Sequence, residues 1–234
     1  SAVNLLEELN TPAYKIASFE LTDIPLIKYA ASKNKPMFIS TGLGNSGEIK
    51  EAIDICKSQG NNKILLFHCI SSYPAEISDY QIGDITYIKN KFNVEVGLSD
   101  HTTSNLASSL SIALGACAIE KHFKLNDKDN SPDSSFSINP KEFKSLVENC
   151  NLSFIASKTN NLKRPDSEKS NKKFRRSIYF VKNLPKGHIL KSTDIKRIRP
   201  GYGLDPKHFY EIIGKRLIKN VRYAEAVTWD AIKV

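Results

Sequence analysis

The sequence lacks the features that mark a membrane protein or a secreted protein. It has no run approaching eighteen consecutive apolar residues, so it predicts no membrane span. The opening stretch SAVNLLEELN has neither the basic head nor the apolar core of a secretion signal. We therefore expect a cytoplasmic protein with no membrane partner.

Cysteine is also scarce, with four residues and no CxxC pair. These cysteines are Cys56, Cys69, Cys117 and Cys150. Cys69 and Cys117 lie inside apolar, strand-like runs, which favours buried free thiols over disulfides or a zinc site.

The formal net charge is +9, and basic residues gather in one stretch. Between Lys158 and Arg176 there are eight basic residues against Asp166 and Glu168. Such a stretch is typical of a solvated linker, a site for a small anion, or a nucleic-acid surface. Because aromatic residues are few there and no recognition helix is evident, we expect a linker and no nucleic-acid partner.

The first 150 residues alternate between strand-like and helix-like patterns. Apolar or β-branched runs predict strands at Ala13–Ser18, Pro36–Thr41, Lys63–Ser71, Val94–Ser99 and Cys117–His122. Helical patterns separate them at 23–34, 46–60, 84–92 and 103–115, with Asn45 or Ser46 able to cap the second. The unit length indicates β/α repeats with a parallel sheet.

Polar side chains gather at or just past the carboxyl end of every predicted strand. They are Lys15, Ser18 and Glu20; Ser40 and Thr41; Ser71 and Tyr73; Ser99 and His101; and Glu120 and His122. Short polar residues also end strands for structural reasons alone. Their recurrence at five strands nevertheless favours an active site at the carboxyl edge of the sheet.

Two of these strands end in a histidine, in VEVGLSDH and ACAIEKHF. If the side chains converge, His101 and His122 could bind one divalent metal, with water or substrate completing its shell. General acid–base roles are the alternative. His68 lies within the apolar run LLFHC, where a core histidine is the better interpretation.

Lys15 stands among strand-end hydroxyls, which together suit a phosphate or a carboxylate. A Schiff-base lysine is the competing hypothesis, although that role calls for a desolvated pocket. Glu20 and Glu120 could transfer protons or only pair with a lysine. Asp133, in the loop SPDSSFS, suits sugar hydroxyls, and Arg199, in RPGYG, could present a guanidinium with a fixed aim.

The composition changes after the β/α repeats. Residues 158–173 are polar, lack apolar periodicity and predict a linker. Short alternating strands and turn signals then predict a small β-rich domain, with one helix near 207–213.

Several motifs together resemble one enzyme family. PAYKIASFE, STGLG, GLSDHT, GACAIEKHF and PDSSFS, in this order, resemble the nonulosonic (sialic-type) acid synthases. FRRSIYFVK, RIRPGYGL, IIGKR and TWDAI are similar to the SAF, or antifreeze-like, domain of that family. The motifs YKIASFE and PDSSFS are similar to those of the pseudaminic acid branch, whereas the neuraminic and legionaminic branches have different residues at these positions.

The resemblance implies an α/β fold in which part of a TIM (β/α)8 barrel precedes a small β-rich SAF domain. We expect the barrel part at residues 1–157, the linker at 158–173 and the SAF domain at 174–234. Family members run about a hundred residues longer at the N-terminus, so we expect about five of the eight β/α units here.

The resemblance also implies roles for individual residues. His101 and His122 would bind a divalent metal, typically Mn²⁺, with Mg²⁺ or Co²⁺ possible. Lys15, Ser18, Ser40, Ser71 and Ser99 would bind phosphoenolpyruvate; the position of Ser71 is an asparagine in the neuraminic branch. Tyr73, Asp133 and Arg199 would contact the sugar, and Glu20, Glu120 and His122 would act in catalysis.

The implied reaction condenses phosphoenolpyruvate with an amino-sugar aldehyde, 2,4-diacetamido-2,4,6-trideoxy-altrose, and releases phosphate. The implied assembly is a domain-swapped homodimer in which Arg199 reaches the partner's barrel. N-acetylneuraminic or legionaminic acid synthesis is the alternative within the family. An inactive fragment that binds glycans or another chain is the alternative of a different class.

Overall fold

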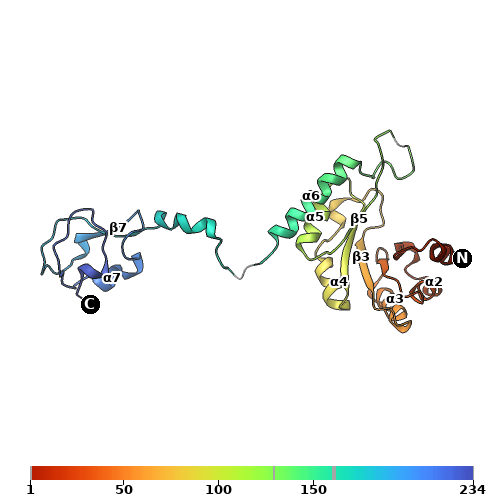
Figure 1. The fold of residues 1–234 in the computed structure, drawn as a ribbon, viewed down its shortest axis with the longest axis horizontal. Helices are drawn as coiled ribbons and strands as arrows, with labels where there is room; N and C mark the ends of the chain where they lie inside the picture. Colours follow the sequence, from red (N-terminus) through yellow and green to blue (C-terminus); the bar gives the residue numbers. More distant parts are fainter. Residues whose placement is uncertain (1, 129, 160–161, 234) are drawn as a thin grey trace. The chain divides into compact units, whose positions relative to one another are not determined.

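The chain forms two compact units. The computed structural model describes residues 2–128, 130–159 and 162–233. Contacts divide the chain into Ser1–Lys158 and Thr159–Val234, and Figure 1 shows the elements of each unit. Within the described residues, no helix has the length and apolar character needed to cross a membrane.

The N-terminal unit alternates strands and helices, as the sequence predicts. Its strands are β1 (Tyr14–Ile16), β2 (Met37–Ser40), β3 (Ile64–Cys69), β4 (Glu95–Asp100) and β5 (Ile119–Lys121). Its helices are α1 (Ala2–Glu8), α2 (Ile24–Ala31), α3 (Ser46–Ser58), α4 (Asp84–Phe92), α5 (Leu106–Ala113) and α6 (Pro140–Ala156). Short 3₁₀ turns η1 (Ser18–Glu20) and η2 (Ile77–Asp79) follow β1 and β3.

The five strands form one parallel sheet in the order β1-β2-β3-β4-β5. The register pairs Lys15 with Phe38, Cys69 with Ser99, and Ser99 with Glu120. In Figure 1 the helices follow one another around the outside of the sheet. The predicted α/β fold with five consecutive β/α units is therefore confirmed.

Local chemistry explains the helix ends. The Asn45 side chain accepts hydrogen bonds from the N–H groups of Gly47 and Glu48, while Glu48 caps the Asn45 N–H. This reciprocal capping box satisfies N–H groups that otherwise lack partners at the start of α3. Gly60 and Gly115 follow α3 and α5 with φ of +76° and +102°, a conformation that glycine adopts without strain.

One face of the sheet packs on the helices, and the other carries polar side chains. Alternate strand residues, such as Ile16, Ile39, Leu66 and Leu98, are buried in the core against the helices. Because successive side chains in a strand point to opposite faces, the residues between them lie on the inner face. Sequence periodicity thus assigns the apolar positions to packing and leaves the inner face for chemistry.

The C-terminal unit has its own apolar core. Its elements are η3 (Asp166–Phe174), β6 (Ser177–Phe180), η4 (Ser192–Asp194), β7 (Ile195–Ile198), η5 (Pro206–His208), α7 (Phe209–Ile212) and η6 (Trp229–Ala231). The strands β6 and β7 pair antiparallel, and isolated bridges such as Leu184–Val221 extend the pairing. Phe180, Leu190 and Ile212 are almost fully buried at its centre.

Part of the predicted linker is helical. Asp166–Phe174 forms the 3₁₀ segment η3, whose residues are not buried, and residues 160 and 161 lie outside the described residues. The absence of apolar periodicity correctly indicated exposure. It did not indicate a coil, because a solvated segment can still form local turns.

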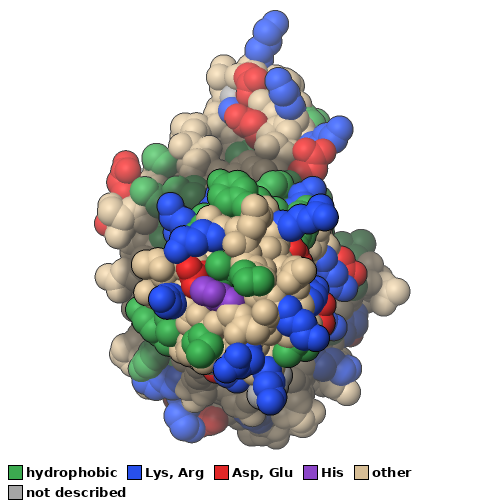
Figure 2. All heavy atoms as spheres, turned by 90° about the vertical axis from the view of Figure 1, so that its left-hand side faces the viewer, with side chains coloured by type: hydrophobic (Ala, Val, Ile, Leu, Met, Phe, Trp, Pro, Cys, Tyr) green, Lys and Arg blue, Asp and Glu red, His purple; other side chains and the backbone are tan. Residues whose placement is uncertain are grey.

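The two units differ in charge. Residues 159–234 carry 19 Lys and Arg against 7 Asp and Glu, a formal charge of +12. Residues 1–158 carry 15 Lys and no Arg against 18 Asp and Glu, a formal charge of −3. Figure 2 shows Lys and Arg side chains spread over the viewed face of the C-terminal unit. The positive excess of the chain therefore belongs to that unit.

Two features differ from the sequence predictions. Cys117 is exposed, because it precedes β5, which is an edge strand of the sheet; the prediction that it is buried was wrong. The helix α6 was not predicted, although Asn139 and Glu142 form a capping box and Pro140 occupies its first turn. Cys69 is buried as expected, and the four cysteines are free thiols.

Candidate functional site

Two charged side chains from opposite edges of the sheet meet on its inner face. Lys15 lies on β1 and Glu120 on β5, yet Lys15 Nζ is 3.6 Å from Glu120 Oε1. Four strand spacings in a flat sheet would separate the two backbones by about 19 Å. The sheet is therefore strongly curved, and its concave inner face is where the candidate site is built.

Hydroxyl groups surround Lys15 on this face. Lys15 Nζ donates a 2.6 Å hydrogen bond to Ser40 Oγ on β2. Ser18 Oγ and Ser71 Oγ, from the segments after β1 and β3, lie 2.8 Å apart. One ammonium with several hydroxyl donors is a suitable environment for phosphate or carboxylate oxygens.

Gly42 and Cys69 support the hydroxyl groups. The Gly42 N–H donates to Cys69 Sγ at 3.2 Å. A Cβ added at Gly42 would lie 2.7 Å from Cys69 Sγ and closer still to Ser71 Oγ, so only glycine fits there. Burial raises the pKa of the Cys69 thiol, against the opposing effects of the Gly42 N–H and the Lys15 charge, which favours a thiol over a thiolate.

Ser99 connects Lys15 and the surrounding serine hydroxyl groups to the two histidines. Its hydroxyl donates a 2.7 Å hydrogen bond to Glu120 Oε1, and its Oγ lies 3.2 Å from His101 Nε2. Ser99 and Glu120 are register partners on β4 and β5. The carboxylate of Glu120 thus lies between Lys15 and Ser99.

The two strand-end histidines lie side by side. The ring centroids of His101 and His122 are 5.4 Å apart. His101 Nδ1 lies 2.7 Å from the Ile70 carbonyl, which fixes the tautomer with Nδ1–H as donor and Nε2 unprotonated. Burial, with a smaller effect from His122, lowers the pKa of His101 and favours the neutral imidazole that metals bind.

Asp133 and two aromatic rings complete this end of the site. His122 Nδ1 is 3.4 Å from Asp133 Oδ2. The Tyr73 ring lies 4.3 Å from the His101 ring and 5.9 Å from the His122 ring, measured between centroids. Phe136 packs against His122 at 4.8 Å. The aromatic rings restrict the orientations of both imidazoles.

The histidine pair fits a divalent metal. Two imidazoles from adjacent strands lie side by side, and the Ile70 carbonyl holds His101 in the tautomer whose unprotonated Nε2 lies next to Ser99 Oγ. In the part of the chain that the structure describes, no group of three or more His, Cys, Asp or Glu could hold a metal ion. The remaining ligands of such a metal would be oxygens of water or substrate.

Two predicted site residues stand apart from this group. Glu20 Oε2 accepts a 2.9 Å hydrogen bond from the Ala17 N–H, so its carboxylate caps its own 3₁₀ turn. Arg199 belongs to the C-terminal unit, directly after β7. There it lines a groove of about 500 Å³ with Arg176, Lys196 and Arg197. The structure thus brings together nine of the predicted site residues: Lys15, Ser18, Ser40, Ser71, Tyr73, Ser99, His101, Glu120 and His122, with Asp133 beside them.

Sequence reasoning missed Cys69, Phe136 and the Ile70 carbonyl as parts of the site. Cys69 was predicted to be buried, but nothing in the run LLFHC shows that its thiol faces the hydroxyls. Phe136 lies within the loop SPDSSFS, whose carboxylate and hydroxyls indicate polar contacts rather than aromatic packing. His68 was correctly predicted as a core residue, since it is buried and its Nε2 lies 2.6 Å from the Tyr80 carbonyl.

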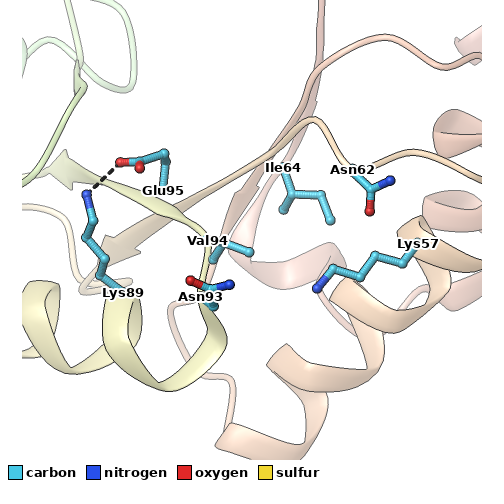
Figure 3. A pocket seen from close by; sticks show the side chains of 7 residues that line it. All are labelled: Lys57, Asn62, Ile64, Lys89, Asn93, Val94 and Glu95. Carbon is cyan, nitrogen blue, oxygen red and sulfur yellow. Dashed lines mark hydrogen bonds and ion pairs between the residues drawn. The ribbon is translucent and has the colours of Figure 1, made fainter.

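A separate pocket lies at the opposite ends of the strands. It has a volume of about 420 Å³ and is lined by Lys57, Asn62, Ile64, Lys89, Asn93, Val94 and Glu95. Figure 3 shows the ion pair between Lys89 and Glu95 at one side of this pocket and Lys57 at the other. None of the predicted site residues lines it, so it is distinct from the candidate site.

The chain is similar in sequence to several named proteins. A pseudaminic acid synthase of Helicobacter pylori is 39% identical over 99% of this chain and 68% of its own length. An N,N'-diacetyllegionaminic acid synthase of Legionella pneumophila is 33% identical over 99% of this chain and 67% of its length. The chain thus spans about two thirds of the curated relatives that it matches.

Solved structures and family models lead to the same assignment. The crystal structure of the spore coat polysaccharide biosynthesis protein spsE of Bacillus subtilis matches all of this chain and 71% of its own chain. Its TM-score is 0.65 and its sequence identity 28%. The NeuB family model matches residues 1–161, and the SAF domain model matches residues 175–233. The chain therefore belongs to the NeuB family and carries a C-terminal SAF domain.

Proposed function

We propose that the chain takes part in nonulosonic acid synthesis as a pseudaminic acid synthase. In the proposed reaction the methylene carbon of phosphoenolpyruvate bonds to the aldehyde carbon of 2,4-diacetamido-2,4,6-trideoxy-altrose. One water is consumed and inorganic phosphate is released. The observation that carries the proposal is the meeting of Lys15, Glu120 and two histidines on one concave face. The similarity to pseudaminic acid synthases over nearly the whole chain supports the choice of product.

Lys15 and its surrounding hydroxyls are the proposed phosphoenolpyruvate site. Lys15 supplies the positive charge, and Ser18, Ser40, Ser71 and Ser99 supply hydroxyl donors for phosphate and carboxylate oxygens. The hydrogen bonds that now join these groups to one another would be exchanged for bonds to the substrate. The site is therefore arranged before the anion arrives, which reduces the cost of binding.

The histidine pair is the proposed metal site. His101 and His122 would hold Mn²⁺, with Mg²⁺ or Co²⁺ as alternatives. A bound divalent ion would polarise the aldehyde oxygen as a Lewis acid. Tyr73 and Asp133 lie beside the imidazoles, where they would contact the sugar.

Glu120 is the proposed proton-transfer residue. It lies within 3.6 Å of Lys15 and accepts from Ser99, so it touches both the proposed anion site and the histidine side of the face. His122 is the second catalytic candidate. Glu20 would need to leave its cap on Ala17 before acting, and it is the least supported of the three by geometry.

The C-terminal unit is proposed to contribute Arg199 to the sugar site of a second copy in a domain-swapped homodimer. Its support is the cationic groove that Arg199 lines and the formal charge of +12 on residues 159–234. An acidic sugar product and phosphoenolpyruvate are both anions, which such a unit would attract.

The test is phosphate release from phosphoenolpyruvate in the presence of Mn²⁺. The chain is assayed alone and together with the N-terminal third of the Helicobacter pylori relative, with the altrose substrate and with the aldehydes of the legionaminic and neuraminic branches. Phosphate release with the altrose substrate, and with neither of the other two aldehydes, supports the proposal. Phosphate release with one of the other aldehydes would assign the chain to another branch of the family. No phosphate release in any combination supports a binding module without activity.

A further inference from the structure

A buried ion pair lies directly behind the two histidines. Asp100 precedes His101, Lys121 precedes His122, and Lys121 Nζ lies 3.1 Å from Asp100 Oδ2. The Asp100 side chain is 0% exposed and the Lys121 side chain is 1% exposed. Asp100 and Lys121 are register partners at the last rung shared by β4 and β5.

The ion pair faces the helices rather than the site. Ser99 and Glu120, one residue earlier on each strand, meet on the inner face. Because side chains alternate along a strand, Asp100 and Lys121 point to the opposite face. Neither group is placed to touch a substrate on the inner face, so a catalytic role does not explain the pair.

Every polar group of the pair has further partners. Asp100 Oδ1 accepts hydrogen bonds from the N–H and the hydroxyl of Thr102, at 2.9 and 2.8 Å. Asp100 Oδ2 accepts from Ser108 Oγ on α5 at 2.6 Å. Lys121 Nζ donates to the carbonyls of Thr102 and Ser104. The ion pair thus ties β5 and α5 to the loop that begins at His101.

We propose that Asp100 and Lys121 are positioning residues that set the separation of His101 and His122. Each histidine is the first residue after its strand, so its backbone position depends on the pair of register partners immediately before it, Asp100 and Lys121. Fixing that rung and the following loop fixes both Cα atoms from which the imidazoles project. A metal held by only two protein ligands depends strongly on their spacing.

Net stabilisation alone is a poor explanation of the pair. The free energy lost when two charges are removed from water is about as large as the free energy gained from their attraction. Apolar replacements of buried ion pairs are therefore often neutral or stabilising. Burial accordingly lowers the pKa of Lys121, against the opposing effect of Asp100. The distinctive contribution of a charge pair at this position is geometric, because five further hydrogen bonds to named groups restrict the arrangement of the ion pair.

This inference rests on the metal role proposed for the histidines, and the experiment separates the two. Mn²⁺ binding to the full chain is followed by electron paramagnetic resonance, which reports free Mn²⁺. The neutral double variant Asp100→Asn/Lys121→Met avoids leaving one buried charge without a partner. Its expected affinity for Mn²⁺ is about 10- to 100-fold weaker, the usual effect of losing groups that orient metal ligands.

A control removes a buried carboxylate from an ion pair far along the chain, whose lysine is half exposed. Asp194 is 3% exposed and pairs with Lys182 at 2.8 Å in the C-terminal unit. Asp194→Asn is expected to lower stability and leave Mn²⁺ affinity unchanged. Equal loss of affinity in this control and in the double variant would overturn the positioning role, since the effect would then follow stability alone.

A second readout needs no metal. The Tyr73 ring lies against both imidazoles, so the ¹H–¹³C NMR signals of His101 and His122 report their placement through ring currents. In the double variant these two signals should move while those of the other histidines stay. Unmoved signals together with wild-type Mn²⁺ affinity would overturn the proposal.

The remaining outcomes are also decisive. If the wild type binds no Mn²⁺, the metal role fails, and the histidine signals alone then confirm or overturn positioning. If the double variant does not fold, Ser108→Ala replaces it, because it removes one of the hydrogen bonds to Asp100 and leaves the ion pair. That variant is expected to move the His101 signal, and an unmoved signal counts against the proposal.

Discussion

Lys15 donates a 2.6 Å hydrogen bond to Ser40, and this contact joins the first two strands of the sheet inside the proposed anion site. Lys15 is the cation of that site, since its neighbours Ser18, Ser71 and Ser99 contribute only hydroxyl groups. The proposed binding of phosphoenolpyruvate therefore depends on this side chain more than on any single serine.

Replacing Lys15 by Met should lower kcat/KM for phosphoenolpyruvate by on the order of 100-fold or more, because a charged donor to the substrate oxygens is lost. The measurement is phosphate release under the conditions that give activity. Lys89→Met is the matched control, since Lys89 forms a 2.8 Å ion pair with Glu95 at the opposite ends of the strands. Equal losses in both variants would refute a specific role for Lys15.

Gly42→Ala should disturb the anion site without removing a polar group from it. The new methyl group would crowd Cys69 and Ser71, so we expect kcat/KM to fall on the order of 10- to 100-fold through displacement of the hydroxyl. Gly83→Ala is the control, because a Cβ there meets nothing within 4 Å. Wild-type kinetics in Gly42→Ala would show that Ser71 is not held by this contact.

The four cysteines should differ in their reaction with a thiol reagent. Cys117 is exposed and Cys150 is partly exposed, whereas Cys56 and Cys69 are buried. Burial raises the pKa of Cys56 to about 11, so little thiolate forms at neutral pH. We expect Cys117 and Cys150 to be labelled in the native chain and Cys56 and Cys69 only after unfolding, as mass spectrometry of the labelled peptides would show. Labelling of Cys69 at the rate of Cys117 would contradict the inner-face packing.

The C-terminal unit should lose stability in acid. Burial alone would raise the pKa of Asp194, but hydrogen bonds from Lys182, His188 and the Lys191 N–H outweigh it and lower the value to about 2. Since the folded pKa lies below the usual 3.8, the contribution of Asp194 is fully present above about pH 5 and is lost as the pH falls towards 2. The expected loss in the free energy of unfolding is about 2 kcal/mol.

Fluorescence can follow this transition, because Trp229 is the single tryptophan of the chain and packs on the core of the C-terminal unit. Denaturant unfolding at pH values between 5 and 2 would give the free energy. In Asp194→Asn this part of the pH dependence should disappear. If it persists there, another carboxylate is responsible.

The sequence predicted the framework of the site well. The five strands and the polar residues after them follow from local patterns, because a buried parallel strand needs an apolar run and its carboxyl end needs none. The apolar run LLFHC correctly predicted that His68 lies in the core. Local patterns sufficed wherever a residue's environment is set by its own strand.

The rest depends on how strands far apart in the sequence are placed. The contact between Lys15 and Glu120 requires the curvature of the whole sheet, which no local pattern encodes. The exposure of Cys117 follows from the edge position of β5, and the role of Asp100 and Lys121 follows from one rung of pairing. The capping box of α6, at Asn139 and Glu142, was by contrast visible in the sequence and was overlooked.

The strand order has a consequence for how the chain folds as it is synthesised. Each strand of the sheet pairs with the strand made just before it, so the sheet can grow from β1 in the order of translation. Lys15 and Glu120 are 105 positions apart, and their contact cannot form until β5 has emerged from the ribosome. A nascent chain can therefore pair strands β1 to β4 before Lys15 and Glu120 meet, so these paired strands form before the site does.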